Sequence, residues 1–451
     1  MLFRMLFVIL LLFPLKVVAS QTITEGALIR DAEIEEILKS YISPLFDVAG
    51  LNPNTIRLYI IHSKEVNAFA MGGGRIAVTT GFLLKASSAL QVIGVLAHET
   101  AHLAGNHVIR GAEAYERALL QGLLGTLGGV AAGLAGSPEA AVGILLGSQE
   151  FAKNSLLKFS RSQENAADQG ATRFLDDLGY SSQGMLEFMQ ILRKDDIFSD
   201  QHLDPYASTH PLHSDRIDFF RSHLSRSPHA QKGLPRAFDN NFERLQVKLT
   251  AFTTSPYITL SRFESTDQSP LARYGRAIAH FQNSHVEDSL KEIDSLIQEF
   301  PSDPYFWELK GQILFETGKI KESAIAYERA VKFKPQSPLL RVSWAHSLIE
   351  GNDPRQLETA FLELLRAKTE EPQNPFTYRL LAVCYGKKEK VDLAALSLAE
   401  MALVVGDLEM AEQQAKRALH FLKNDPANHR QAKDILAEAK RLRESGEEVG
   451  F

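Results

Sequence analysis

The spacing of hydrophobic residues divides the chain into segments of different kinds. From residue 31 to about 201 a helical period dominates, apart from one stretch that breaks it. Residues 55–61 and 74–79 are predicted to be short strands, and the glycines between them suit a turn. A helix is predicted from Ala86 to Ala104. Because most of its positions are apolar, each polar side chain inside it needs a partner or a chemical role.

Beyond about residue 260 the hydrophobic pattern repeats with a period of about 34 residues, as in tetratricopeptide helix pairs. A degenerate first copy covers 271–301, further copies begin at Pro338 and Pro375, and 427–444 is predicted to be a closing helix. Stacked pairs leave a concave groove for a peptide or protein partner. A generic α-helical domain is the alternative. In the clearest copy the packing residues are Pro304, Trp307, Gly311, Leu314, Tyr327, Ala330 and Pro335.

Two further apolar segments need an interpretation. Residues 1–20 have a basic residue, a short apolar run and small residues at the expected cleavage position, which predicts a signal peptide; an uncleaved anchor is the alternative. Residues 118–147 are rich in Leu, Gly and Ala. They are predicted to form either a flap that makes peripheral contact with a membrane or a closely packed helical hairpin.

Composition limits the classes of function. The 451 residues are 45% hydrophobic and 23% charged with a net charge of −6, which is typical of a globular protein. A mildly acidic chain without a basic run argues against nucleic acid as a partner. The single cysteine, Cys384, has no partner for an internal disulfide. We predict a signal peptide at 1–20, a catalytic domain at 21–262 and a repeat domain at 263–451.

The sequence His98-Glu99-Thr100-Ala101-His102 lies inside the predicted buried helix. Residues four apart share one face of a helix, so both imidazoles can bind one metal ion while Glu99 faces its open position. Zinc fits this donor set best, with one ion per chain.

A third ligand is expected from a later segment. His107 stands one residue before the position where a metzincin would place its third histidine, so that class does not fit. Glu164 and Asp168 are four residues apart and share a helix face. Glu164 can therefore complete the ligand set, and Asp168 can orient an imidazole.

Three segments together resemble the gluzincin metallopeptidases of the HtpX, Oma and Ste types: HETAHLAGNH, FSRSQENAAD and NAFAMGGGRIAVTTG. The resemblance implies a mainly α-helical chain, with an α+β metallopeptidase domain that has a small sheet, followed by a tetratricopeptide solenoid. It implies that His98, His102 and Glu164 bind zinc, that Glu99 is the catalytic base and that Asp168 is a catalytic-site acid.

The chain departs from the family pattern at Gly72, where proline is common, and at Ala166, where a second glutamate is common. Neither position is a ligand. Asn67, Gly73 and Gly74 keep the pattern, and we expect them to help an edge strand to align an extended substrate.

The stretch around His210-Pro211 and Arg216 also resembles the family. Two roles are predicted for His210: it donates to the oxyanion of the transition state, or it occupies the open zinc position and holds the enzyme inactive. A loop with a surface salt bridge from Arg216 is the alternative.

The resemblance implies a periplasmic zinc metalloendopeptidase that degrades misfolded or stalled outer-membrane proteins and has chaperone activity through its repeats. Its partners would be polypeptide substrates and, through the repeat groove, the outer-membrane protein assembly machinery. The alternative function is a chaperone or adaptor with a latent metal site. A membrane-embedded protease is disfavoured because the mature sequence lacks convincing spans.

Overall fold

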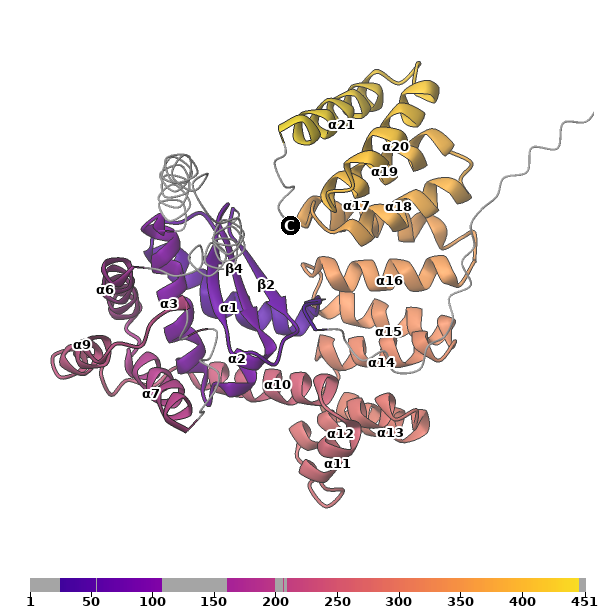
Figure 1. The fold of residues 1–451 in the computed structure, drawn as a ribbon. Coiled ribbons are helices and arrows are strands. Elements are labelled where there is room, and N and C mark those ends of the chain that lie inside the picture. The colour runs from indigo at the N-terminus through magenta and orange to yellow at the C-terminus, as the bar shows by residue number, and fades with distance from the viewer. Residues whose placement is uncertain (1–24, 54, 108–159, 199–205, 207–208, 446–451) are drawn as a thin grey trace, which may run out of the picture. The chain divides into compact units, whose positions relative to one another are not determined.

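A computed structural model describes residues 25–53, 55–107, 160–198, 206 and 209–445 (Figure 1). The predicted signal peptide at 1–20 and the segment 118–147 lie outside these residues. The chain divides into two compact units between Thr254 and Ser255. This division precedes the predicted boundary at 262, because the helix at Pro256–Arg262 packs against the first helix of the repeats.

The sheet of the N-terminal unit has the strand order β1-β2-β4-β3. Strands β2 and β4 are parallel, whereas β1 and β3 pair antiparallel with their neighbours, so β3 lies at an edge. The predicted strands are β2 and β4, and the segment between them contributes β3 as well as a turn. The strands are β1 (Leu28–Ile29), β2 (Arg57–Ile61), β3 (Ala68–Met71) and β4 (Arg75–Thr79).

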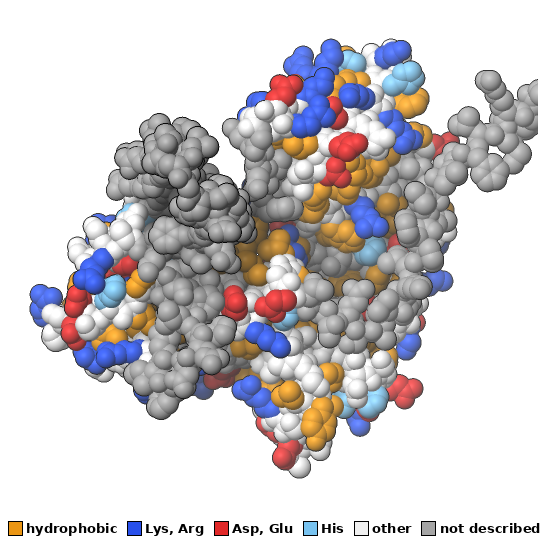
Figure 2. Space-filling view, viewed as in Figure 1, with side chains coloured by type: hydrophobic (Ala, Val, Ile, Leu, Met, Phe, Trp, Pro, Cys, Tyr) orange, Lys and Arg blue, Asp and Glu red, His pale blue; other side chains and the backbone are white. Residues whose placement is uncertain are grey.

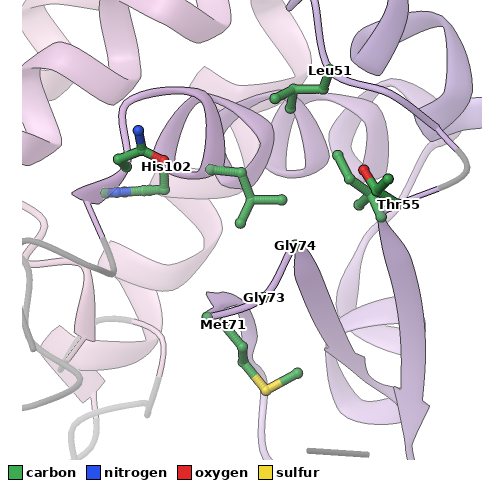
Figure 3. A pocket seen from close by; sticks show the side chains of 10 residues that line it. Leu51, Thr55, Met71, Gly73, Gly74 and His102 are labelled. Carbon is green, nitrogen blue, oxygen red and sulfur yellow. The ribbon is translucent and has the colours of Figure 1, made fainter.

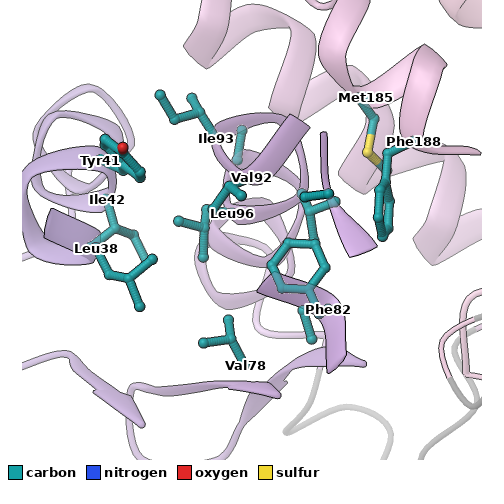
Figure 4. Close-up of a cluster of buried hydrophobic side chains, with 14 of the residues drawn as sticks. Leu38, Tyr41, Ile42, Val78, Phe82, Val92, Ile93, Leu96, Met185 and Phe188 are labelled. Atoms are coloured by element: carbon teal, nitrogen blue, oxygen red, sulfur yellow. The ribbon is translucent and has the colours of Figure 1, made fainter. Parts of the chain in front are cut away.

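Helix α3 (Ala89–Ala104) is the centre of this unit. Figure 4 shows Val92, Ile93 and Leu96 of α3 between side chains of helices α1 and α7 and above Val78 of β4. The other helices are α1 (Ala32–Val48), α2 (Thr80–Lys85), α6 (Arg161–Leu178), α7 (Gln183–Phe198), α9 (Ser214–Leu224) and α10 (Arg236–Thr253).

Helix α3 begins three residues later than the predicted start at Ala86. The Ser88 side chain accepts a hydrogen bond from Gln91 N and caps the helix, and residues 80–85 form the separate helix α2. A close approach then fixes α6 against α3. A Cβ atom added at Gly170 would lie 2.8 Å from the Ala101 Cβ atom, so only glycine permits this contact. The approach brings the first half of α6 to the end of α3 that carries the histidines.

The C-terminal unit is a series of helix pairs, as the repeat pattern predicts. Ser289 and Ser323 each donate a hydrogen bond from a second helix to the carbonyl twelve residues earlier, at Ala277 and Gly311. A Cβ atom at Gly311 would lie 2.9 Å from the Tyr327 ring, which explains why the repeat has a glycine opposite this large side chain. The helices are α11 (Pro256–Arg262), α12 (Pro270–Gln282), α13 (Val286–Glu299), α14 (Pro304–Glu316), α15 (Ile320–Phe333), α16 (Pro338–Glu350), α17 (Leu357–Glu370), α18 (Pro375–Lys387), α19 (Val391–Val404), α20 (Leu408–Phe421) and α21 (Pro426–Ser445).

The fold class is confirmed: a mainly helical chain in which an α+β domain with a four-stranded sheet precedes helical repeats. Within the described residues, no helix has both the length and the apolar character needed to cross a membrane. Hydrophobic side chains reach the surface on α17 to α19, including Leu362, Phe376, Val383 and Val391. Figure 2 shows hydrophobic side chains over these helices and many Lys and Arg side chains around α21.

Candidate metal centre and catalytic site

Four buried side chains from three segments converge at one point. His98 and His102 lie on successive turns of α3, Glu164 lies in the first turn of α6, and His210 comes from the segment before α9. Each offers a ligand atom, and these atoms all lie within 4.8 Å of one another. Sequence reasoning predicted the first three as ligands and gave the open metal position as one of two roles for His210; the structure brings His210 into the same cluster.

The donor atoms have the spacing that a tetrahedral ion requires. Ligands about 2.0–2.2 Å from an ion at tetrahedral angles are roughly 3.3–3.6 Å apart. His98 Nε2 and His102 Nε2 are 3.1 Å apart, and Glu164 carboxylate oxygens lie 3.4 Å and 3.3 Å from these two atoms. Two imidazole nitrogens and a carboxylate at this spacing fit one shared metal ion.

The electrostatics agree with a cation at this point. Burial lowers the pKa of His98, but the Asp168 and Glu164 carboxylates outweigh burial and raise this pKa to about 9. The pKa of His102 is well below its ordinary value, chiefly because of burial. The carboxylates thus favour one positive charge beside His98, which a metal ion can supply in place of a proton, and burial favours the neutral form of His102 that a ligand needs.

Asp168 and Arg216 support the ligands from behind. Asp168 Oδ1 lies 2.9 Å from His98 Nδ1, which leaves the His98 Nε2 lone pair toward the metal position. Arg216 binds Asp168 with Nε and Nη2 at 2.7 and 2.8 Å, and its Nη1 lies 2.6 Å from Glu164 Oε2. Burial acts to raise the pKa of Asp168, but the Arg216 charge lowers it overall. Arg216 is 1% exposed, so the alternative of a surface salt bridge is wrong.

Glu99 is hydrogen-bonded through one oxygen, and its other oxygen faces His210. Its Oε2 accepts a hydrogen bond of 2.9 Å from the Ala70 main-chain N–H on β3, and its Oε1 has no hydrogen-bond partner within the described part of the chain. Complete burial raises the pKa of Glu99. A fixed carboxylate with one available oxygen and a raised pKa is suited to accept a proton near neutral pH.

His210 lies beside the same ligands. Its Nδ1 is 3.0 Å from Glu164 Oε1 and 3.3 Å from His98 Nε2, and its Nε2 is 3.6 Å from Glu99 Oε1. The ring stacks on Tyr206, with centroids 4.6 Å apart. His210 Nδ1 therefore lies where a fourth ligand atom would lie.

His107 contacts a ligand rather than the metal position. Its Nδ1 is 3.0 Å from His102 Nδ1, and Gln163 Nε2 of α6 donates to its carbonyl. His107 can therefore fix the orientation of the His102 ring, as an outer partner of a ligating histidine does.

The predicted substrate-binding residues lie around the edge strand. The Asn67 N–H donates to the Thr79 side-chain hydroxyl, and the Asn67 carbonyl accepts from the Thr79 main-chain N–H. Gly73 and Gly74 form the turn after β3 with φ of +75° and +71°, a conformation that favours glycine. The contribution of these three residues to substrate binding remains a prediction.

The comparison with known families agrees with this geometry. Residues 29–223 match peptidase family M48, and residues 274–338 match a tetratricopeptide repeat. The N-terminal unit is a peptidase family M48 domain. Its histidine pair and carboxylates make it a metallopeptidase domain, and tetratricopeptide repeats follow it. This confirms the family resemblance in the sequence.

Several proteases are similar to most or part of this chain. It is 23% identical to the beta-barrel assembly-enhancing protease of Yersinia pestis over 84% of this chain and 78% of the relative. It is 22% identical to the protein of that name in Escherichia coli K12, over 73% and 68% of the two chains. Human mitochondrial metalloendopeptidase OMA1 is 27% identical over 41% of this chain and 36% of its own.

Sequence reasoning missed two parts of the M48 site. The Ala70 N–H that holds Glu99 belongs to the main chain, so no residue type could have indicated it. Tyr206, which is buried against His210, stands four residues before that histidine, and His210 N donates to its carbonyl. The spacing of four residues, about one helical turn, was the sequence signal that could have placed Tyr206 beside His210.

Proposed function

We propose that the protein is a zinc endopeptidase of the periplasm that degrades misfolded or stalled outer-membrane proteins. The observation that carries the proposal is the convergence of two imidazoles and a carboxylate beside a buried glutamate with one available oxygen. The names of the relatives from Yersinia pestis and Escherichia coli support the client class. The predicted signal peptide supports the compartment.

His98, His102 and Glu164 would hold the zinc ion. When bound there, zinc supplies a strong Lewis acid and makes a water molecule acidic enough to attack a peptide bond near neutral pH. Asp168 holds the His98 ring in the ligating orientation, and Arg216 holds both Asp168 and Glu164.

Glu99 carries the proton. Its Oε1 accepts a proton from the attacking water, and the raised pKa lets the same oxygen return the proton to the leaving amine. The Ala70 N–H keeps Oε2 in place throughout, so the carboxylate need not rotate between the two transfers.

His210 acts as an inhibitory fourth ligand in this proposal. The position of its Nδ1 beside Glu164 and His98 supports this role over the oxyanion role, which would require the imidazole to stand back from the ligand atoms. His210→Ala should raise proteolysis of unfolded casein, and His213→Ala, a nearby change outside the cluster, should not. A drop in the His210→Ala chain would favour the oxyanion role instead.

The repeats would hold clients or the outer-membrane protein assembly machinery. Tetratricopeptide pairs are protein-binding scaffolds, and exposed hydrophobic side chains on α17 to α19 suit partly unfolded polypeptides. The same surface would provide chaperone activity without cleavage. The peripheral membrane contact of residues 118–147 stays a prediction.

The test uses the purified full chain with an unfolded outer-membrane protein and with casein, with zinc or with a chelator. Glu99→Gln should lower turnover by about 10²–10⁴-fold while bound zinc is unchanged. Glu328→Gln, an exposed glutamate of α15, is the matched control. Turnover that persists in the zinc-bound Glu99→Gln chain would show that the proposed peptidase mechanism is wrong. Equal turnover of casein and the outer-membrane protein would contradict the client class.

A further inference from the structure

A pocket with a volume of about 170 Å³ opens beside His102. The end of α3 forms one wall, and the turn between β3 and β4 forms another (Figure 3). His102 lies at one end of the pocket and Thr55 at the other, with Gly73 and Gly74 between them. The pocket therefore shares a residue with the metal site but extends beyond it.

Apolar groups make up somewhat more than half of the lining, and Thr55, His102 and Asn106 add polar ones. Leu51, Ile56, Met71 and Leu103 contribute their side chains, and no lining residue carries a formal charge at neutral pH. Leu51, Ile56 and Leu103 pack on the hydrophobic core behind them, so their positions are fixed. An aliphatic group that enters would remove apolar surface from water. A cationic group would lose water without gaining a partner, because the charge beside Gly73 is the Arg75 guanidinium, which donates to the Gly72 carbonyl.

The size suits a single side chain. Pockets for drug-sized ligands have volumes of about 300–1,000 Å³, well above this one. The turn supplies a wall without side chains: a Cβ atom at Gly74 would lie 3.0 Å from the Thr55 carbonyl oxygen, whereas one at Gly72 would meet nothing within 4 Å. Gly72 is thus a position where a side chain can be added without a clash.

The sheet register relates the pocket to the cleaved bond. The Thr79 N–H donates to the Asn67 carbonyl in the ladder, so the alternation of antiparallel pairing turns the main-chain groups of Ala68 and Ala70 away from β4. Ala70 N–H contacts Glu99 there. A substrate strand added antiparallel to β3, the more stable pairing, places residues on the amino-terminal side of the cleaved bond over the turn after Met71.

We propose that this pocket is a specificity subsite that holds one aliphatic side chain of the substrate, on the amino-terminal side of the cleaved bond. The inference rests on the proposed peptidase function and names the residue preference of the same site.

The test maps cleavage sites by mass spectrometry. The full zinc-loaded chain, with and without the His210→Ala change, is incubated with casein and with peptides that differ only in Leu, Ala, Phe or Asp at one position. Leu should exceed Ala and Asp by at least about tenfold in kcat/KM at one of the three positions before the cleaved bond. Leu103→Ala should shift the preference toward Phe, and Gly72→Val should shift it toward Ala.

The control is Leu84→Ala, which removes a similar contact with the same core outside the pocket. It should leave the preference unchanged. Chelator-sensitive cleavage without an aliphatic preference, with a preference after the cleaved bond, or with the same preference in the Gly72→Val chain would overturn the subsite and leave the peptidase intact. Absence of chelator-sensitive cleavage in every chain would overturn both.

Discussion

The two units bury their charged groups in different ways. The peptidase unit buries its charges in networks: Arg216, Asp168 and Glu164 at the site are almost completely excluded from water, and a second network joins Lys248 of α10 to Glu33 of α1. The repeat unit distributes its buried charges along the helices in small separate groups, such as the pair of Arg276 with Glu292. A concentrated network is useful for chemistry but depends on every member, whereas separate pairs can be changed one at a time. Substitutions in the first unit should therefore have larger effects.

Removal of Arg216 should have the largest effect. Arg216→Ala leaves two buried carboxylates without their cation, and we expect a loss of about 3–5 kcal/mol in the free energy of unfolding. Arg221→Ala, which breaks an exposed pair with Asp218 on the same helix, is the matched control and should cost less than about 1 kcal/mol. Hydrogen exchange of the full chain, followed in peptides from α3 and α6, measures both. Equal effects would contradict the larger role given to the buried network over an exposed pair of the same helix.

In the repeat unit, the largest loss of stability should come from a change in packing. Gly311→Ala places a Cβ atom against the Tyr327 ring and should cost about 1–3 kcal/mol. Gly386→Ala on α18 meets nothing within 4 Å and should be neutral or slightly stabilising. Both tryptophans, Trp307 and Trp344, lie in this unit, so their fluorescence during urea unfolding reports on it. A neutral Gly311→Ala would mean that the Tyr327 ring can move away.

Substitutions of His107 test whether residues beyond the metal ligands contribute to metal binding. Because it contacts His102 Nδ1, His107→Ala should weaken zinc binding by about 10–100-fold. Competition with a chromophoric chelator measures this affinity without reference to activity. His107→Asn, which can still form a hydrogen bond to an imidazole, should restore part of the affinity. Unchanged affinity in both variants would limit His107 to packing.

The titration of His346 in the repeat unit should have the smallest effect at neutral pH and should lower stability only in acid. Burial, together with the Arg379 charge, lowers the pKa of His346 to about 4. Above the ordinary pKa of about 6.5 both the folded and the unfolded chain hold this histidine neutral, so it contributes nothing. Between pH 6.5 and 4 the unfolded chain binds the proton first, and stability falls by about 1–3 kcal/mol. The difference between wild type and His346→Phe, measured by tryptophan fluorescence, isolates this titration.

His346 packs between Phe315 and Phe376, with ring centroids 4.6 and 5.1 Å away, so the phenylalanine variant suits its surroundings. Glu350 is the nearest acid, at 3.8 Å, and would offset part of the penalty. A wild-type chain that loses no more stability than the variant would show that Glu350 offsets all of it.

The sequence predicted local relations better than distant ones. His98 with His102, and Glu164 with Asp168, are pairs one helical turn apart, and the helical period is enough to place each pair on one face. The repeat helices were predictable for the same reason, since their period is local. Strand β1 was not predicted, because a two-residue strand carries no alternation. The sequence also did not determine the side from which His210 approaches the site, because contacts with Tyr206 and Arg216 place its loop.

The hydrogen bond from Ala70 to Glu99 has a consequence for the way this position can vary. The donor is a peptide N–H, which every amino acid except proline possesses. An alanine scan would pass over the contact, and drift among small residues at position 70 would leave it intact. Only Ala70→Pro removes the donor, and in doing so it also alters the strand edge beside it. The orientation of the general base is thus encoded in the path of the backbone, where substitution seldom reaches it.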